Sequence, residues 1–201
     1  KMEAEGRSVP KWVKNMLATG RESFYRQEGP NLTHFYPEKS ESTAVPMSAK
    51  WLVLDAEKNR EGFVLKKGSS ASILDLGDGI LGLEFHGKMN AIDDPMIHLY
   101  GEALNWLDAG KYQGMVVGNQ AGSAFCAGAN LFMVGMAAMQ GKWTDLENMI
   151  AALQSTLQRA KYSAAPVVTA PYGLTLGGGC EIAMHGAAAQ AAGELYMGLV
   201  E

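Results

Sequence analysis

Cysteine is scarce in this sequence of 201 residues, which has only Cys126 and Cys180. Two cysteines without C-x-x-C spacing predict neither a disulfide framework nor a zinc site, so we expect no metal. Thiols outside any such framework fit a reducing cytoplasm. Cys126 precedes a predicted helix, so a cysteine nucleophile is an alternative to the simpler interpretation of a small buried thiol.

Long apolar runs and an excess of one charge are also absent. No stretch approaches the ~18 consecutive apolar residues of a membrane-spanning helix, and no secretory signal is visible. The net charge of −4 is too small to indicate binding to nucleic acid or to an anionic membrane. No G-x-x-x-x-G-K-[ST] or G-x-G-x-x-G motif occurs, which argues against a P-loop or a dinucleotide site. From these absences we expect a cytoplasmic globular protein.

The composition changes near residue 47. Before it, the sequence predicts a short amphipathic helix at Pro10–Leu17, followed by a polar, proline-containing segment (22–46) that we expect to be an irregular arm or linker. After it, short apolar runs alternate with helical patterns, which indicates an α/β fold. The strands are predicted at 51–54, 63–65, 71–76, 80–85, 114–118, 165–171 and 187–197, and the helices at 94–109, from 131, at 143–160 and at 177–185.

Two details of this pattern are specific enough to check. Asp94 is expected to cap the helix at 94–109, with Pro95 in its first turn and Gly110 at its end. The methionines that include Met133 and Met136 are interpreted as adaptable core residues.

Two loops of small residues, Phe125–Asn130 and Gly177–Glu181, each follow a predicted strand and precede a helix. Glycine and alanine leave their N–H groups accessible, so such a pair can bind an anionic oxygen. Glu181 and the last residue, Glu201, add two carboxylates able to transfer protons. Alternatively, Glu181 only stabilises its helix, Glu201 is solvated, and the glycines serve backbone packing.

Four segments now carry a family resemblance: EFHGKMNAI at Glu84–Ile92, FCAGANL at Phe125–Leu131, the stretch Pro166–Glu181 ending in GGGCE, and YMGLVE at Tyr196–Glu201. In this order they resemble the crotonase (enoyl-CoA hydratase/isomerase) superfamily, over roughly two thirds of the chain. The resemblance implies a ClpP/crotonase-like fold of repeated β-β-α units with two nearly perpendicular sheets. With the composition change near residue 47 as its start, we expect the crotonase-like domain at residues 47–201, incomplete at the C-terminus.

The same resemblance implies the site. The N–H groups of Ala129 and Gly178 would form the oxyanion hole for a coenzyme A thioester, and Glu181 and Glu201 would be the catalytic acids that hydrate 2-enoyl-CoA to 3-hydroxyacyl-CoA in fatty-acid β-oxidation. Having both acids favours a hydratase; an isomerase, a thioester hydrolase or a non-catalytic acyl-CoA-binding unit are the alternatives. Two positions depart from the family pattern, since Asn130 stands where Asp is usual and Val200 where Pro is common. The implied substrate-binding residues are Lys88, Asn90, Ala91, Ala127, Gly128, Asn130, Leu131 and Gly177.

Residues 1–46 resemble the tail of a 3-hydroxyacyl-CoA dehydrogenase unit in bacterial fusion proteins, on the segments Pro10–Val13 and Gly20–Tyr25. This implies a parent chain whose dehydrogenase domain is the partner of the crotonase-like unit. NAD would bind only in that missing part, so no cofactor is expected here besides the acyl-CoA substrate. The family also implies a homo-oligomer and further helices after the second acid, so the chain alone is expected to be a weak enzyme.

Overall fold

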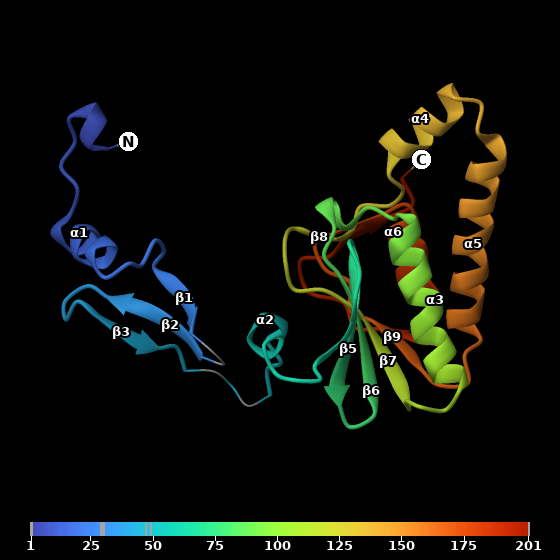
Figure 1. The fold of residues 1–201 in the computed structure, drawn as a ribbon, viewed down its shortest axis with the longest axis horizontal. Helices are drawn as coiled ribbons and strands as arrows, with labels where there is room; N and C mark the ends of the chain where they lie inside the picture. Colours follow the sequence, from blue (N-terminus) through green and yellow to red (C-terminus); the bar gives the residue numbers. More distant parts are fainter. Residues whose placement is uncertain (1, 29–30, 47, 49, 201) are drawn as a thin grey trace. The chain divides into compact units, whose positions relative to one another are not determined.

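The computed structural model describes residues 2–28, 31–46, 48 and 50–200 (Figure 1). Its contacts divide the chain into two compact units, Lys1–Glu61 and Gly62–Glu201. The composition change places the boundary earlier, near residue 47. The resemblance of the first 46 residues to a dehydrogenase tail stays a prediction.

The first unit is more regular than its sequence predicts. The helix at Pro10–Leu17 is confirmed as α1 (Lys11–Ala18), with Pro10 at its N-cap. The expected irregular arm is wrong: its place is taken by a three-stranded antiparallel sheet of β1 (Tyr25–Glu28), β2 (Asn31–Tyr36) and β3 (Glu41–Ala44). The strand expected at 51–54 is also wrong, because helix α2 (Leu54–Glu57) begins there. A short 3-10 helix, η1 (Glu3–Glu5), precedes α1.

A buried arginine links the strands of the small sheet. The Arg21 side chain is only 3% exposed, and its guanidinium donates to the hydroxyls of Thr33 (3.0 Å) and Ser42 (2.6 Å) and to the carbonyl of Phe24 (3.1 Å). These acceptors lie in β2, in β3 and next to β1. One rigid cation therefore crosslinks all three strands through charge-assisted hydrogen bonds.

The second unit contains two sheets. The larger one has the order β11-β9-β7-β6-β5-β4: β4, β5 and β6 pair antiparallel, and β6, β7, β9 and β11 pair parallel. The smaller one is parallel, with the order β12-β10-β8. The strand bounds are β4 Val64–Lys67, β5 Ala71–Gly77, β6 Ile80–Phe85, β7 Gly114–Gly118, β8 Ala124–Cys126, β9 Val167–Thr169, β10 Leu174–Leu176, β11 Ala188–Ala189 and β12 Tyr196–Gly198.

A repeated unit connects the two sheets. In the pairs β7–β8, β9–β10 and β11–β12, the first strand joins the larger sheet and the second joins the smaller one. Helices α4 (Leu131–Met139) and α6 (Gly178–Met184) follow β8 and β10. The predicted α/β class and its β-β-α repeat are therefore confirmed. The single strand expected at 187–197 is wrong, because this segment supplies a strand to each sheet.

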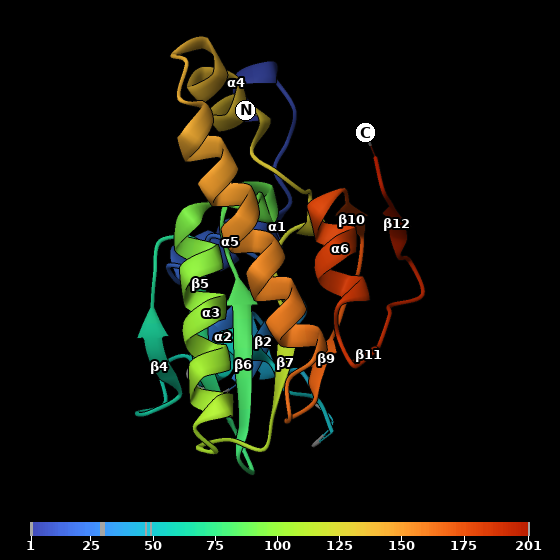
Figure 2. The same cartoon turned by 90° about the vertical axis from the view of Figure 1, so that its right-hand side faces the viewer.

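Two long helices, α3 (Asp94–Asp108) and α5 (Trp143–Lys161), lie side by side (Figures 1 and 2). Helix α3 packs against β5 and β6 of the larger sheet, and α5 joins the same core through Leu157 and Ala160 near its C-terminal end. The N-cap of α3 is Asp93 and not Asp94: Asp93 has the extended backbone of a capping residue, and its carboxylate accepts from Met96 N–H (2.9 Å) and Ser70 Oγ (2.6 Å). The core between helices and sheet includes Ile73, Leu83, Phe85, Tyr100, Leu104 and Val117.

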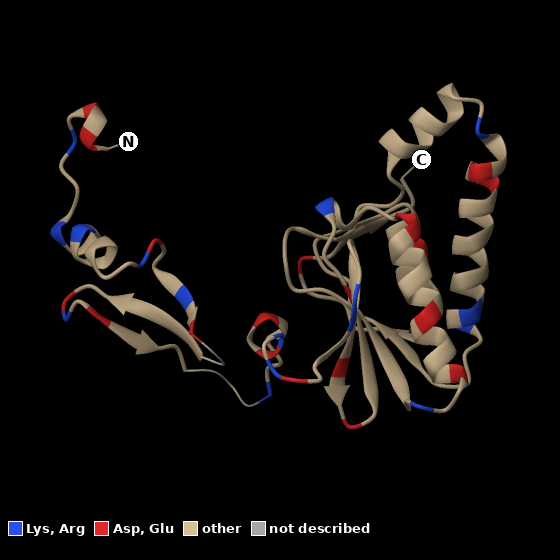
Figure 3. Ribbon diagram, in the orientation of Figure 1, with Lys and Arg blue, Asp and Glu red and all other residues tan. Residues whose placement is uncertain are grey.

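Helix α4 differs from its neighbours because none of its residues is buried. Its ribbon also carries no charged residue (Figure 3). Met133 is 58% exposed and Met136 40%, so the interpretation of these methionines as core residues is wrong. Across the described ranges, no helix is both long and apolar enough to cross a membrane.

Candidate active site

The two predicted loops touch through their glycines. A Cβ on Gly128 would lie 2.8 Å from the Leu176 carbonyl oxygen and 3.4 Å from the Gly178 nitrogen. Gly128 also has φ of 88°, which favours glycine. A Cβ on Gly179 would lie 2.2 Å from the Cys126 carbonyl oxygen. Side chains at these positions would push the loops apart, so the glycines permit the close approach.

The direction of two amides follows from their hydrogen-bonded neighbours. The Gly128 carbonyl accepts from Ile92 N–H (2.8 Å), and in a trans peptide the following N–H, that of Ala129, points the opposite way. The Gly177 carbonyl accepts from Glu181 N–H (3.1 Å) within α6, so the Gly178 N–H points out of the helix N-terminus. Two main-chain donors on touching loops have the composition of an oxyanion site.

Glu181 lies beside one of these donors. It occupies the first turn of α6 and is exposed. Its Oε2 lies 3.6 Å from the position that a Cβ on Gly178 would take. The carboxylate therefore lies next to the glycine loop and is accessible from solvent.

Glu201, the second predicted acid, lies outside the described residues. The strand before it is described: β12 pairs parallel with β10, and Gly177 N–H donates to the Gly198 carbonyl (3.0 Å). The Val200 carbonyl oxygen lies 3.6 Å from the Cβ position on Gly177. The backbone at Val200, the residue before Glu201, therefore lies beside the second loop.

Of the other predicted substrate-binding residues, some are exposed and some are buried. Lys88 and Leu131 are exposed, and Ala91, Ala127 and Gly177 are half-buried. Asn90 is buried and donates from Nδ2 to the Ala124 carbonyl. Asn130 caps α4, accepting from Met133 N–H (3.2 Å). Asparagine and aspartate cap helices about equally well, so the departure at Asn130 leaves this loop geometry intact.

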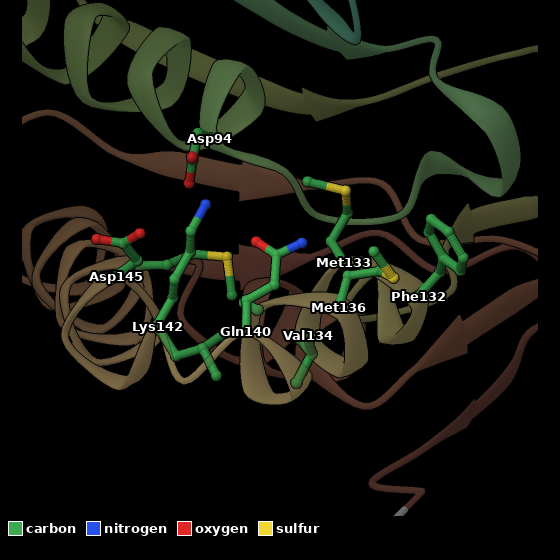
Figure 4. A pocket seen from close by; sticks show the side chains of 11 residues that line it. Asp94, Phe132, Met133, Val134, Met136, Gln140, Lys142 and Asp145 are labelled. Atoms are coloured by element: carbon green, nitrogen blue, oxygen red, sulfur yellow. The ribbon is translucent and has the colours of Figure 1, made fainter.

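An apolar cavity that the sequence analysis missed lies next to the first loop. It has a volume of about 400 Å³, and its walls come from α3, α4 and α5. Figure 4 shows Phe132, Met133 and Met136 at one end, and Lys142, Asp145 and Asp94 at the other, with the Lys142 ammonium directed toward Asp94. The methionine-rich sequence of α4 was the available signal, but it equally fits a core helix.

Neither cysteine has the properties of a nucleophile. Both are buried. Burial raises the pKa of the Cys126 thiol to about 11, and burial together with the nearby Glu181 charge raises the pKa of Cys180. The thiolate is therefore disfavoured, and the alternative of a Cys126 nucleophile is wrong. Within the described part of the chain, no group of three or more His, Cys, Asp or Glu side chains could hold a metal ion.

Comparison with known proteins connects this geometry to a family. The family model for enoyl-CoA hydratase/isomerase matches residues 79–197, which include both loops, Glu181 and most of the second unit. A Bacillus subtilis protein described as a probable 3-hydroxyacyl-CoA dehydrogenase is 44% identical over 201 residues, covering 100% of this chain and 25% of its own length. A Rickettsia prowazekii protein described as a fatty acid oxidation complex trifunctional enzyme is 32% identical over 114 residues, which are 57% of this chain and 16% of that protein.

The chain thus spans a quarter or less of the length of these relatives. Solved structures resemble the fold. An enoyl-CoA hydratase from Bacillus anthracis has a TM-score of 0.58 at 20% identity, covering 65% of this chain and 50% of its own. A carnitinyl-CoA dehydratase from Mycobacterium thermoresistibile has a TM-score of 0.61 at 15% identity, covering 66% and 39%. With the family match over more than half of the chain, we conclude that this chain belongs to the enoyl-CoA hydratase/isomerase family.

Proposed function

We propose that this chain is the hydratase part of a larger fatty-acid β-oxidation protein, and that it adds water to 2-enoyl-CoA thioesters. The observation that carries the proposal is the contact of the two glycine loops, which brings the peptides of Ala129 and Gly178 onto touching loops, the second of them beside Glu181. The names of the relatives support the wider setting, including a 3-hydroxyacyl-CoA dehydrogenase domain in the same parent chain that would use NAD. A homo-oligomer and a cytoplasmic location stay predictions.

The proposed chemistry follows from where charge develops. Water oxygen bonds to the β carbon of the enoyl group while a carboxylate takes its proton, and negative charge develops on the thioester oxygen. The N–H groups of Ala129 and Gly178 stabilise that charge; losing one such donor typically raises the barrier by roughly 2.7–4 kcal/mol. A carboxylic acid then delivers a proton to the α carbon. Glu181 and Glu201 share these two proton transfers.

The apolar cavity provides a place for the acyl chain. It begins at Phe132, two residues after the loop that ends at Asn130. Its volume lies in the usual range for small-molecule sites, and flexible methionines suit chains of differing length. We therefore place the thioester at the loops and its hydrocarbon tail along α4.

The test is crotonyl-CoA hydration by the full-length parent protein, compared with its Glu181→Gln and Glu201→Gln variants. We expect both variants to bind the thioester and to lose at least about 100-fold in kcat, in the range of a lost general acid or base. A parent that binds the thioester while both variants keep full turnover would disprove the two-glutamate mechanism. If only Glu181→Gln lowers kcat, and the parent protein is found to move the double bond of an enoyl-CoA instead of adding water to it, the result would support an isomerase.

A further inference from the structure

The turn Lys88–Ile92, which we call the bridging turn, contacts both glycine loops. Its Met89 carbonyl accepts from Ala127 N–H (3.1 Å), and its Ile92 N–H donates to the Gly128 carbonyl (2.8 Å). A Cβ on Gly178 would lie 2.6 Å from Ile92 Cδ1, so Ile92 also packs against the second loop. The position of the two proposed donors therefore depends on the conformation of this turn.

That conformation is unusual. Met89 and Asn90 have φ of 55° and 49°, in the left-handed region. Side chains with a Cβ rarely adopt this region, although asparagine tolerates it better than most. Two such residues in succession persist only where the surroundings hold them in place.

The Asn90 side chain supplies such a hold. Asn90 is 4% exposed, and its Nδ2 donates to the carbonyl of Ala124 (2.9 Å), the first residue of β8. A carbonyl acceptor requires the NH₂ end of the amide, which fixes the orientation of the side chain. Its Oδ1 is then buried without a partner among the described residues. The bond to Ala124 is therefore the side-chain hydrogen bond through which this amide holds the turn.

We propose that Asn90 is a positioning residue for the oxyanion site. By joining the bridging turn to the start of β8, it fixes the loop Phe125–Asn130 and so the place of the Ala129 N–H. The inference rests on the proposed function, but it gives Asn90 a role other than substrate contact. A displacement of about 1 Å between reacting groups can cost roughly 100-fold in rate, so a modest loosening of this turn has a measurable effect.

The experiment uses the full-length parent protein with two substitutions at Asn90. Asn90→Asp keeps the shape and the tolerance of left-handed backbone but replaces the donor by an oxygen; Asn90→Gly keeps the backbone and removes the side chain. For both, we expect kcat for crotonyl-CoA hydration to fall about 10- to 100-fold while KM stays within about threefold. We also expect faster amide hydrogen exchange in peptides spanning residues 124–131. Because Asn90→Gly adds no buried charge, it remains informative if Asn90→Asp fails to fold.

Ser72→Ala is the matched control. It removes another side-chain hydrogen bond of the same unit, between the buried Ser72 Oγ and the half-buried His86 Nε2 (2.8 Å), and should change neither kcat nor exchange at 124–131. Unchanged exchange in the Asn90 variants would overturn the positioning role whatever their activity, and so would faster exchange with unchanged kcat. An unsubstituted parent without hydratase activity would overturn the proposed function, while exchange would still decide whether Asn90 holds the loop.

Discussion

At the scale of single residues, two helical glycines have opposite surroundings. A Cβ on Gly179 would lie 2.2 Å from the Cys126 carbonyl oxygen, whereas a Cβ on Gly135 would meet nothing within 4 Å. We expect Gly179→Ala to lower the free energy of unfolding by at least about 2 kcal/mol, because backbone must move apart. Gly135→Ala, the control, should raise it by up to about 1 kcal/mol through helix propensity. Urea denaturation of the two variants measures both; equal stabilities would contradict the close contact of the loops.

A second pair of residues tests hydrogen bonding in the core. The Tyr100 hydroxyl is buried without a partner among the described residues, and burial raises its pKa. Tyr100→Phe should therefore be neutral or stabilising by about 1 kcal/mol. The Tyr172 hydroxyl has two acceptors within hydrogen-bond distance for its one hydrogen, the Ala121 carbonyl (2.8 Å) and Asn119 Oδ1, so Tyr172→Phe should cost about 1 kcal/mol. Thermal denaturation compares them, and a larger loss for Tyr100→Phe would mean that its hydroxyl has a partner.

Cys126 makes a prediction about pH. Burial raises the pKa of its thiol in the folded state to about 11, whereas a cysteine thiol in the unfolded chain has its ordinary pKa of 9.0. Between these values the unfolded chain binds fewer protons, so its contribution to stability is present below pH 9 and is lost as the pH rises toward 11. The free energies of unfolding of the unsubstituted protein and of Cys126→Ala, measured by denaturation at several pH values, should differ less and less as the pH rises from 9 to 11. A constant difference would contradict the raised pKa.

At the scale of elements, Arg21 forms hydrogen bonds to residues in β2 and β3 of the small sheet. Arg21→Lys keeps the charge but loses the planar set of donors that reaches Thr33 and Ser42. We expect a loss of about 1–3 kcal/mol, seen as faster hydrogen exchange in β1, β2 and β3. The matched control is Arg26→Lys, at an exposed arginine of the same sheet whose ion pair with Glu28 is long, at 3.9 Å. Equal effects from the two substitutions would argue against the buried arginine as the organising residue.

The same elements show what the sequence can predict. Strands β5, β6 and β7 and helices α3 and α5 follow from local hydrophobic patterns. The sheet β1-β2-β3 does not, because Arg21 bonds to residues 12 and 21 positions later in the chain and a polar strand has no apolar stripe to detect. The split of 187–197 between two sheets was equally invisible, since only tertiary pairing separates β11 from β12.

The site shows a similar division. Glycine loops and a neighbouring acid can be identified from sequence, because only small residues permit the approach of Gly128 to Leu176. The bond from Asn90 to Ala124 joins residues 34 positions apart, so no local pattern reveals it. The cavity along α4 was missed because apolar helices in cores and beside ligands have the same composition.

At the scale of the whole molecule, the two units have cores of very different size. The second unit has a continuous core that includes Phe85, Leu104 and Phe125, whereas the buried apolar residues in the described part of the first are Met16, Phe35 and Leu54. Opening free energies follow buried apolar contacts, so we expect amides in β5, β6 and β7 to exchange much more slowly than those in β1, β2 and β3. Mass spectrometry of exchanging peptides measures this, and similar protection in both sheets would contradict it.

The two proposed donors, at Ala129 and Gly178, are main-chain N–H groups, and this limits which parts of the site a mutation can remove. A change of codon alters a side chain, and only proline removes a backbone donor. The carboxylates, in contrast, can be replaced one at a time. Related proteins with this backbone can therefore replace the carboxylate residues and catalyse a different reaction. They still keep the two N–H groups that bind an anionic oxygen.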